Sequence, residues 1–350
     1  MRRLATLLLL TLVVSSRAAT AQASVNCQAA AGRIATKADA RSKAPRILLR
    51  YDMEGLSGQD DWRTFSYWWP EEYAKGQRLL AADVNAVVDG LFAGGAASVE
   101  VWDAHGSGAD EDNLPSNLLD KRARAMSVGT ESNAPDSTKW DALVLVAMHA
   151  KIGTGGFAAH TGTFGHDWIV NGRSISESER SAYSYNAVGI PVIFITGDDR
   201  LGADMREVMP WVQYVTTKYA QAPDRVRLRP VAEVHEEMRA QARVAVEQLA
   251  SACLLRPSTP VRAAFRALPP ANLAMMANIP GVTMVDGAVT FEAPDWEAAR
   301  RAMSALATIA SGAHQVLINR ELRNHPDARR AAQRALWSEW MELEKKRSPY

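Results

Sequence analysis

The sequence is poor in cysteine and has almost no net charge. Among its 350 residues are two cysteines, Cys27 and Cys253, and its formal net charge is +1. Two cysteines so far apart form no zinc-finger cluster, and a near-neutral chain has no basic field that would attract nucleic acid. The Gly-x-Ser-x-Gly motif of serine hydrolases and the His-Glu-x-x-His motif of zincins are also missing, which disfavours both enzyme classes.

The first 23 residues have the pattern of a signal peptide. Met1–Arg3 is basic, Leu4–Val14 is apolar but too short to span a bilayer as a helix, and Ala21–Ala23 fits the small-x-small rule for cleavage. We therefore expect a secreted or periplasmic protein whose mature chain begins near Ser24. An uncleaved membrane anchor is the less favoured alternative. No later segment is apolar enough to be a membrane span.

The predicted export affects the oxidation state expected for the two cysteines. An oxidising compartment permits a disulfide between Cys27 and Cys253. Cys253 lies in an apolar stretch, however, so a buried free thiol is an equally good interpretation. The small and polar residues 24–45 are predicted to form a flexible lead-in.

Apolar segments that end in polar residues predict a mostly parallel sheet. The four expected strands are Arg46–Tyr51 before Asp52, Ser98–Trp102 before Asp103, Ala142–Met148 before His149, and Pro191–Thr196 before Asp198. A one-sided apolar pattern over Glu71–Phe92, stopped by Gly94, predicts a helix. Alternating strands and helices predict an α/β domain over residues 46–225, with helices on both faces of the sheet.

The rest of the chain predicts a smaller α+β domain, residues 226–325, that serves packing and assembly. Its expected elements are helices over Ala232–Leu249 and Asp295–Ser311 and strands over Val261–Leu268 and Gly287–Glu292. Residues 326–350 are predicted to form a helical tail with Trp337 and Trp340 near one face.

Candidate metal ligands stand where the predicted strands end. In such sheets ligands bind beyond the carboxyl ends of the strands, so Asp52, Glu54, His105 and His149 are expected to share a pocket. Imidazoles and carboxylates bind zinc-like ions, and Asp52 can bridge two ions that together activate one water. Taken singly, the acids have the ordinary alternative of a solvated loop pair, and each histidine that of a satisfied turn or core residue.

Two further segments have open interpretations. The glycine-rich residues 151–165 include His160 and form either a mobile surface loop or a lid that brings this histidine over the metals as acid, base or nucleophile. The aromatic residues 61–69 either line a substrate pocket or contact a neighbouring subunit, and the contact is the favoured interpretation.

The ordered motifs of the chain resemble those of the DppA-type D-aminopeptidases, the M55 family of metallopeptidases. The matching stretches are Tyr51–Gly58, Asp103–His105, Met148–Ala150, Ala159–Thr161, Ser176–Glu177, Ala182–Tyr183 and Gly197–Arg200. The resemblance implies a two-zinc aminopeptidase that releases N-terminal D-amino acids from short peptides. It also implies an α/β domain with a smaller second domain, and a ring-shaped homodecamer.

The resemblance assigns a role to each candidate residue. Asp52 would bridge the two zinc ions, Glu54 and His105 would complete one site, His149 and Glu177 would complete the other, and His160 would be the catalytic histidine.

Three departures from the family pattern stand out. Arg50 replaces a usual serine, the stretch after His160 is one residue short so that Glu179 competes with Glu177, and the signal peptide and helical tail are atypical. A two-metal amidase or esterase on another small substrate, and a non-catalytic exported binding protein of the same fold, remain as alternatives.

Overall fold

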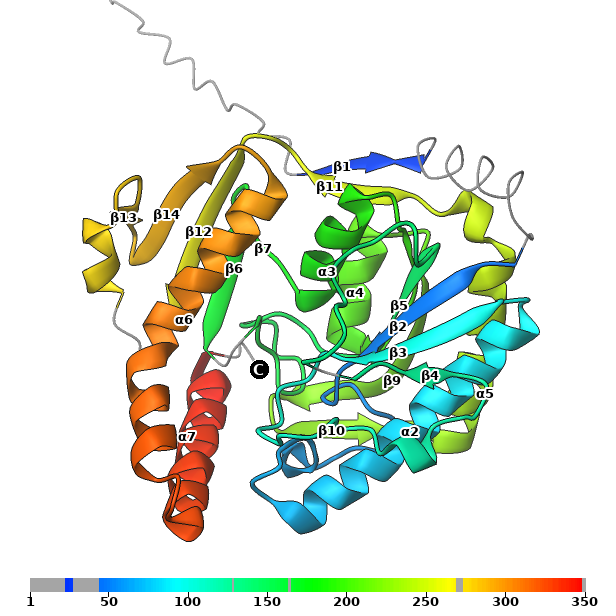
Figure 1. The fold of residues 1–350 in the computed structure, drawn as a ribbon, viewed down its shortest axis with the longest axis horizontal. Coiled ribbons are helices and arrows are strands. Elements are labelled where there is room, and N and C mark those ends of the chain that lie inside the picture. The colour runs from blue at the N-terminus through cyan, green and yellow to red at the C-terminus, as the bar shows by residue number, and fades with distance from the viewer. Residues whose placement is uncertain (1–22, 28–43, 128, 163–164, 269–272, 348–350) are drawn as a thin grey trace, which may run out of the picture.

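The computed structural model describes residues 23–27, 44–127, 129–162, 165–268 and 273–347. The predicted signal peptide, apart from its last residue, lies outside these residues. The described chain forms a larger unit on a seven-stranded sheet, a smaller unit on a five-stranded sheet, and a two-stranded sheet of β1 and β11 (Figure 1).

The larger sheet is almost entirely parallel. Its order is β10-β9-β8-β5-β2-β3-β4, and only the β9–β10 pair is antiparallel. The strands are β2 (Arg46–Tyr51), β3 (Ser98–Asp103), β4 (Arg124–Ala125), β5 (Ala142–Met148), β8 (Val192–Asp198), β9 (Gln213–Ala222) and β10 (Arg225–Leu228). The α/β prediction is confirmed, and β5 is buried along its whole length as a doubly covered strand should be.

Helices cover both faces of this sheet. On one face lie α2 (Pro70–Ala93) and α5 (Val231–Glu247), and on the other lie α3 (Glu177–Ala187) and α4 (Asp199–Val208). Side chains of β5 alternate between the two cores, with Val144 and Val146 on the α2 side and Leu143 and Leu145 on the α3 side. Short 3-10 turns connect the elements: η1 (Trp62–Phe65), η2 (Ser116–Leu118), η3 (Leu249–Ser251) and η4 (Ala274–Asn278).

The smaller sheet is antiparallel and takes strands from both halves of the chain. Its order is β13-β14-β12-β6-β7, and α6 (Trp296–Glu321) packs against it. The strands are β6 (His166–Val170), β7 (Arg173–Ser174), β12 (Val261–Ala267), β13 (Thr283–Val285) and β14 (Ala288–Ala293). The two units therefore do not follow the predicted division at residue 226, since β6 and β7 precede it and α5, which follows it, packs on α2.

An Asn-Gly turn explains the β6–β7 hairpin. Asn171 and Gly172 have φ angles of 50° and 86°, and they connect Val170 to its partner Arg173. Two consecutive positive φ angles suit a two-residue hairpin, and Asn-Gly is the sequence that favours it most. The Asn-Gly pair is thus a local signal in the sequence for this hairpin.

The N-terminal segment is held against residues 253–257 by a strand pairing and a disulfide. β1 (Ala23–Asn26) pairs antiparallel with β11 (Leu254–Pro257), and Cys27 forms a disulfide with Cys253. Of the two interpretations of the cysteines, the structure has the disulfide. Residues 24–26 thus belong to a strand and Cys27 to a disulfide, where a flexible lead-in was predicted.

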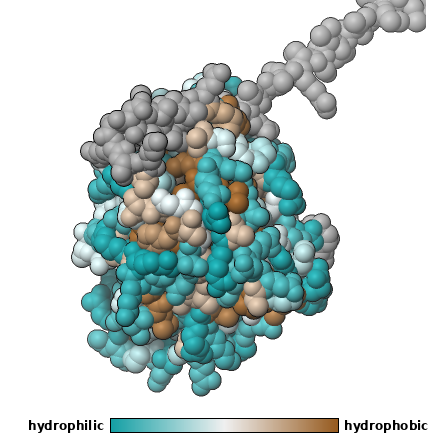
Figure 2. Space-filling model, turned by 90° about the vertical axis from the view of Figure 1, so that its right-hand side faces the viewer, coloured by the Kyte–Doolittle hydropathy of each residue, from teal (hydrophilic) through white to brown (hydrophobic). Residues whose placement is uncertain are grey.

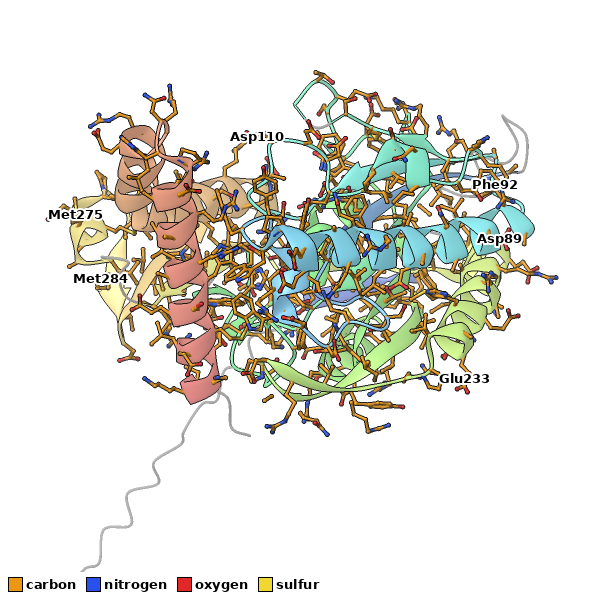
Figure 3. The ribbon with its side chains drawn as sticks, turned by 90° about the horizontal axis from the view of Figure 1, so that it is seen from below. Asp89, Phe92, Asp110, Glu233, Met275 and Met284 are labelled. Carbon is orange, nitrogen blue, oxygen red and sulfur yellow. A yellow bond between two sulfur atoms is a disulfide. The ribbon has the colours of Figure 1, made fainter. Side chains whose placement is uncertain are left out.

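One face of the molecule is covered largely by hydrophilic residues, with apolar groups among them (Figure 2). Exposed large hydrophobic residues include Met275, Met284 and Val285, which lie on or near the β13 edge of the smaller unit (Figure 3). No helix within the described ranges is both long and apolar enough to cross a membrane.

Candidate metal centre

Polar residues follow the carboxyl ends of three neighbouring strands of the larger sheet, and these residues lie close together. Asp52 follows β2, His105 follows β3 and His149 follows β5. The loop after β2 crosses the end of β5, where the Asp52 amide donates to Val146 O at 2.9 Å and the Gly55 amide to Ala147 O at 2.8 Å. A Cβ at Gly55 would lie 2.1 Å from the Met148 carbonyl oxygen, so only glycine allows this crossing.

The five predicted ligands lie in two groups that share Asp52. We call them together the centre. Asp52 Oδ1 lies 2.7 Å from His105 Nδ1, which is also 3.2 Å from Glu54 Oε2. Asp52 Oδ2 lies 3.6 Å from His149 Nε2, which is 3.7 Å from Glu177 Oε1. Each group offers three ligand atoms within 4.8 Å of one another.

The donor atoms of the second group fit a cation. His149 Nδ1 lies 3.0 Å from Ala150 O and must donate to it, because a carbonyl oxygen only accepts. In its neutral form the ring turns the lone pair of Nε2 toward the carboxylates of Asp52 and Glu177, and this buried nitrogen has no hydrogen-bond partner among the described residues. Acceptors that face one another in a buried site repel unless a cation lies between them.

Burial makes the carboxylates of the centre depend on positive charge. Asp52 is 3% and Glu54 1% exposed. Burial raises the pKa of Asp52, and the Glu54 carboxylate raises it further. Burial also opposes ionisation of Glu54, but His105 outweighs it and lowers the pKa to about 2. Two adjacent buried carboxylates repel each other, and a cation bound between them would relieve this repulsion.

Glu177, rather than Glu179, faces the centre. Both lie in the first turn of α3, behind the N-cap Ser176. Glu179 closes the capping box, where its Oε2 accepts from the Ser176 amide at 3.0 Å, and it forms an ion pair with Arg173. Glu177 instead points toward the imidazoles, and Arg180 holds its second oxygen at 3.1 Å.

His160 stacks on the centre from the glycine-rich segment. Its ring lies 3.9 Å from that of His149, nearly parallel, and its amide donates to Ala150 O at 3.1 Å. His160 Nδ1 lies 2.8 Å from Ala158 O, so the proton of the neutral ring is on Nδ1 and the lone pair on Nε2. Burial lowers the pKa of His160 to about 3, with His149 adding to the effect, and the ring is therefore neutral at pH 7.

The aromatic residues near position 65 pack within the chain. Phe65 meets His105 edge-on at 5.9 Å and Trp337 at 5.6 Å, and Trp69 lies 6.5 Å from Trp337. Trp337 belongs to α7 (Pro326–Arg347), which lies between the two units beside α6 (Figure 1). The partner of this aromatic segment is thus the helical tail, an alternative that the sequence did not suggest.

A buried acid on α7 makes the docking of this helix sensitive to pH. Burial, with Asp167 adding, raises the pKa of Glu344 to about 7 against the opposing effects of Arg347 and Gly153. The folded state holds the Glu344 proton more tightly than the unfolded state does. The contribution of protonated Glu344 to the free energy of unfolding is therefore complete below the ordinary pKa near 4.5, and it is lost as pH rises through 7.

We expect the free energy of unfolding to fall between pH 5 and pH 8 by about 1–3 kcal/mol more in the wild type than in Glu344→Gln. Glutamine keeps the neutral shape at both pH values, so the variant lacks this contribution. Urea denaturation at the two pH values measures the difference. Equal pH dependence in both proteins would show that Glu344 is not protonated in the fold.

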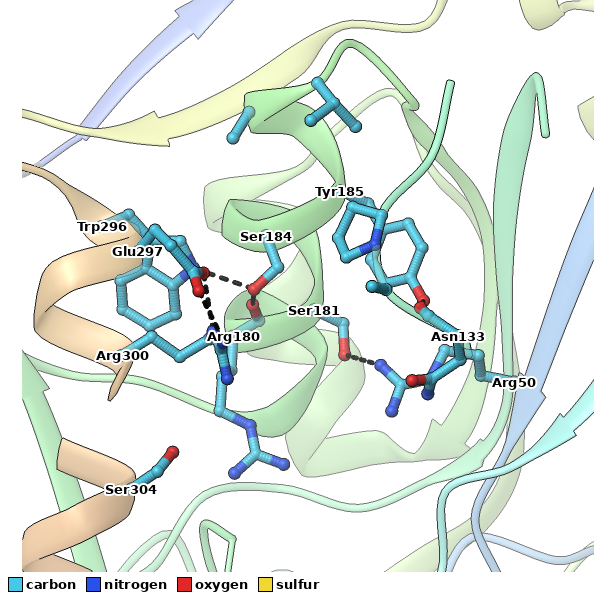
Figure 4. Close-up of a pocket in the computed structure, with 14 residues that line it drawn as sticks. Arg50, Asn133, Arg180, Ser181, Ser184, Tyr185, Trp296, Glu297, Arg300 and Ser304 are labelled. Carbon is cyan, nitrogen blue, oxygen red and sulfur yellow. Dashed lines mark hydrogen bonds and ion pairs between the residues drawn. The ribbon is translucent and has the colours of Figure 1, made fainter. Parts of the chain in front are cut away.

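A pocket of about 550 Å³ lies on another side of α3, between α3 and α6 (Figure 4). Arg180 borders it and connects it to Glu177, and Arg50 donates there to Ser181 Oγ at 3.1 Å. None of the five candidate ligands lines this pocket. The reactive groups of the molecule therefore lie at the centre and not in this pocket.

Buried carboxylates and imidazoles grouped at the carboxyl end of a parallel sheet are the ligand set that metal-dependent hydrolases use. The chain belongs to the M55 peptidase family, described as D-aminopeptidase, whose model matches residues 46–305. It is accordingly a metallo-aminopeptidase, and the family expected from the motifs is confirmed.

A sequence relative and a solved structure are similar to the chain. A D-aminopeptidase from Bacillus subtilis (strain 168) is 26% identical over 275 residues, which cover 76% of this chain and 97% of that protein. A solved structure described as the zinc-dependent D-aminopeptidase DppA from Bacillus subtilis, a self-compartmentalizing protease, has a TM-score of 0.69 at 22% identity. It matches 76% of this chain and 98% of its own. This second similarity confirms the fold.

Proposed function

We propose that the protein is a zinc aminopeptidase that releases N-terminal D-amino acids from short peptides. The observation that carries this proposal is the arrangement around Asp52, whose two oxygens face two separate groups of ligand atoms. The Bacillus subtilis relative and the solved Bacillus subtilis structure are both described as D-aminopeptidase, and the description of the structure names zinc, which supports the choice of metal and substrate.

In this proposal the five residues of the centre hold two divalent ions. Asp52 would contribute to both sites, Glu54 and His105 would complete one of them, and His149 and Glu177 would complete the other. When bound, the ions supply Lewis acidity that polarises the scissile carbonyl. The carbonyls of Ala150 and Ala158 fix the proton positions on His149 and His160.

His160 is the proton carrier of the proposed reaction. Its neutral ring can accept a proton at Nε2 from the attacking water and give it to the leaving amine, while Nδ1 remains bonded to Ala158 O, so the ring need not move to change its charge. Stacking on His149 holds it over the second group. The Glu177 carboxylate, 3.8 Å from Nε2, stabilises the imidazolium that forms.

We further propose that the protein acts outside the cytoplasm, as a homo-oligomer. Residues 1–23 serve as the signal peptide, and the disulfide between Cys27 and Cys253 is in keeping with an oxidising compartment. The exposed apolar residues at the β13 edge support an assembly role for the smaller unit. The self-compartmentalizing relative supports assembly as well.

A stereochemical panel tests the proposed activity. The purified protein is assayed on alanyl dipeptides that begin with D- or L-alanine, and on the N-acetylated D form. We expect kcat/KM for the D form to exceed that for the L form by about 10²-fold or more, and no cleavage of the blocked peptide. Cleavage of simple esters or amides without peptide hydrolysis would favour the amidase or esterase alternative.

A further inference from the structure

The helix α7 lies beyond the part of the chain that the family shares. The family model ends at residue 305, and 97% of the Bacillus subtilis relative is already matched by 76% of this chain. α7 begins at Pro326. It is therefore an addition to the common fold, and its position beside the centre needs an explanation.

Two tryptophans on one face of α7 pack against residues that flank the centre. Trp340 meets the ring of His160 edge-on at 5.6 Å, with an interplanar angle of 84°. Trp337, about one turn earlier, lies 5.6 Å from Phe65, which in turn lies edge-on to His105 at 5.9 Å. Trp337 and Trp340 are 6% and 5% exposed, so the two indoles form a buried, packed layer.

Polar contacts hold α7 on both sides of the indole pair. Arg334 Nε donates to the Trp68 carbonyl oxygen at 2.7 Å, and Lys345 forms an ion pair with Asp224 at 2.9 Å. Arg334 also lies over the ring of Trp69, 5.5 Å from its centroid. Because tryptophan has only two side-chain torsions, a pair held in this way is a stiff surface.

The layer leaves the centre closed on this side. The side chains of His105, His160 and Glu177 are only 3%, 9% and 9% exposed. An extended pentapeptide spans about 17 Å, whereas the indole of Trp340 stands 5.6 Å from His160. A chain bound at the centre can continue past α7 only if these indoles give way.

We propose that Trp337 and Trp340 form a specificity wall that limits the length of the peptides that the enzyme accepts. The wall excludes longer peptides by occupying the space through which their remaining residues would pass. The inference rests on the proposed function, because it takes the centre as the place where the peptide is cleaved. Neither indole takes part in the chemistry, so its removal changes which peptides fit.

The test compares peptide lengths in Trp340→Ala, Trp340→Phe and Glu339→Ala. Glu339 is exposed on the same turn and serves as the matched control. We expect the ratio of kcat/KM for a D-alanine-led pentapeptide to that for the dipeptide to rise about tenfold or more in Trp340→Ala. The ratio should rise less in Trp340→Phe and stay unchanged in Glu339→Ala. An equal fall for both peptides would mean a merely structural role and would overturn the proposal.

A second readout does not need the peptidase activity. The rate at which diethyl pyrocarbonate modifies His160, followed by peptide mass spectrometry, should rise about tenfold or more in Trp340→Ala, because burial controls access to the ring. If the wild type cleaves no D-peptide, the proposed function fails and this rate alone decides whether α7 covers the centre. Unchanged labelling in folded Trp340→Ala and Trp340→Phe proteins overturns the wall.

Discussion

Replacing His149 with alanine is expected to abolish metal binding at one group of the centre and to remove peptidase activity. The change deletes the imidazole that faces both Asp52 and Glu177, and it leaves two buried carboxylates without the ring that lies between them. Loss of a residue that merely orients a ligand costs 10–100-fold, so loss of the ligand should lower kcat/KM by at least about 10²-fold. Elemental analysis should give no more than one metal ion per chain.

A second histidine provides the control for this variant. His166 is also buried, but it packs against Phe265 in the smaller unit, with 4.9 Å between the rings. His166→Ala should therefore keep the metal content of the wild type. Full metal content and full activity in His149→Ala would remove the residue from the ligand set.

Replacing His160 with alanine is expected to separate metal binding from turnover. The variant should keep both ions, because the five ligands remain, and it should lose about 10²–10⁴-fold in kcat, the usual contribution of a positioned proton-transfer group. KM should change little. Steady-state kinetics and metal analysis on the same preparation give both quantities.

The geometry also allows His160 to be a metal ligand, and the metal content of this variant separates the two roles. Glu54, His149 and His160 also place ligand atoms within 4.8 Å of one another. Loss of a metal ion from His160→Ala would make the residue a ligand, and unchanged turnover would remove it from the reaction. Either result contradicts the role of proton carrier.

Much of the centre was predictable because it depends on strand ends. The carboxyl ends of β2, β3 and β5 must meet at one edge once the strands are parallel neighbours, so Asp52, His105 and His149 could be grouped from the sequence. The choice between Glu177 and Glu179 could not be made from spacing, since it depends on which acid closes the capping box behind Ser176. Only the ion pair with Arg173, on a strand of the other sheet, shows why Glu179 turns away.

Features that depend on distant contacts were not predictable in the same way. The periodicity of α7 identified a helix with Trp337 and Trp340 near one face, but it gave no sign that this face would lie against Phe65 and His160. The assignment of β6 to the smaller sheet depends likewise on its pairing with β12, which follows it by about ninety residues. Local patterns predict elements, whereas such pairings follow from the packing of the whole chain.

The most direct test of the account is anomalous diffraction at the zinc absorption edge from crystals of the purified protein. The account predicts two peaks per chain, one among Asp52, Glu54 and His105 and the other among Asp52, His149 and Glu177. Crystals grown with added zinc that show no peak beside Asp52 would contradict it.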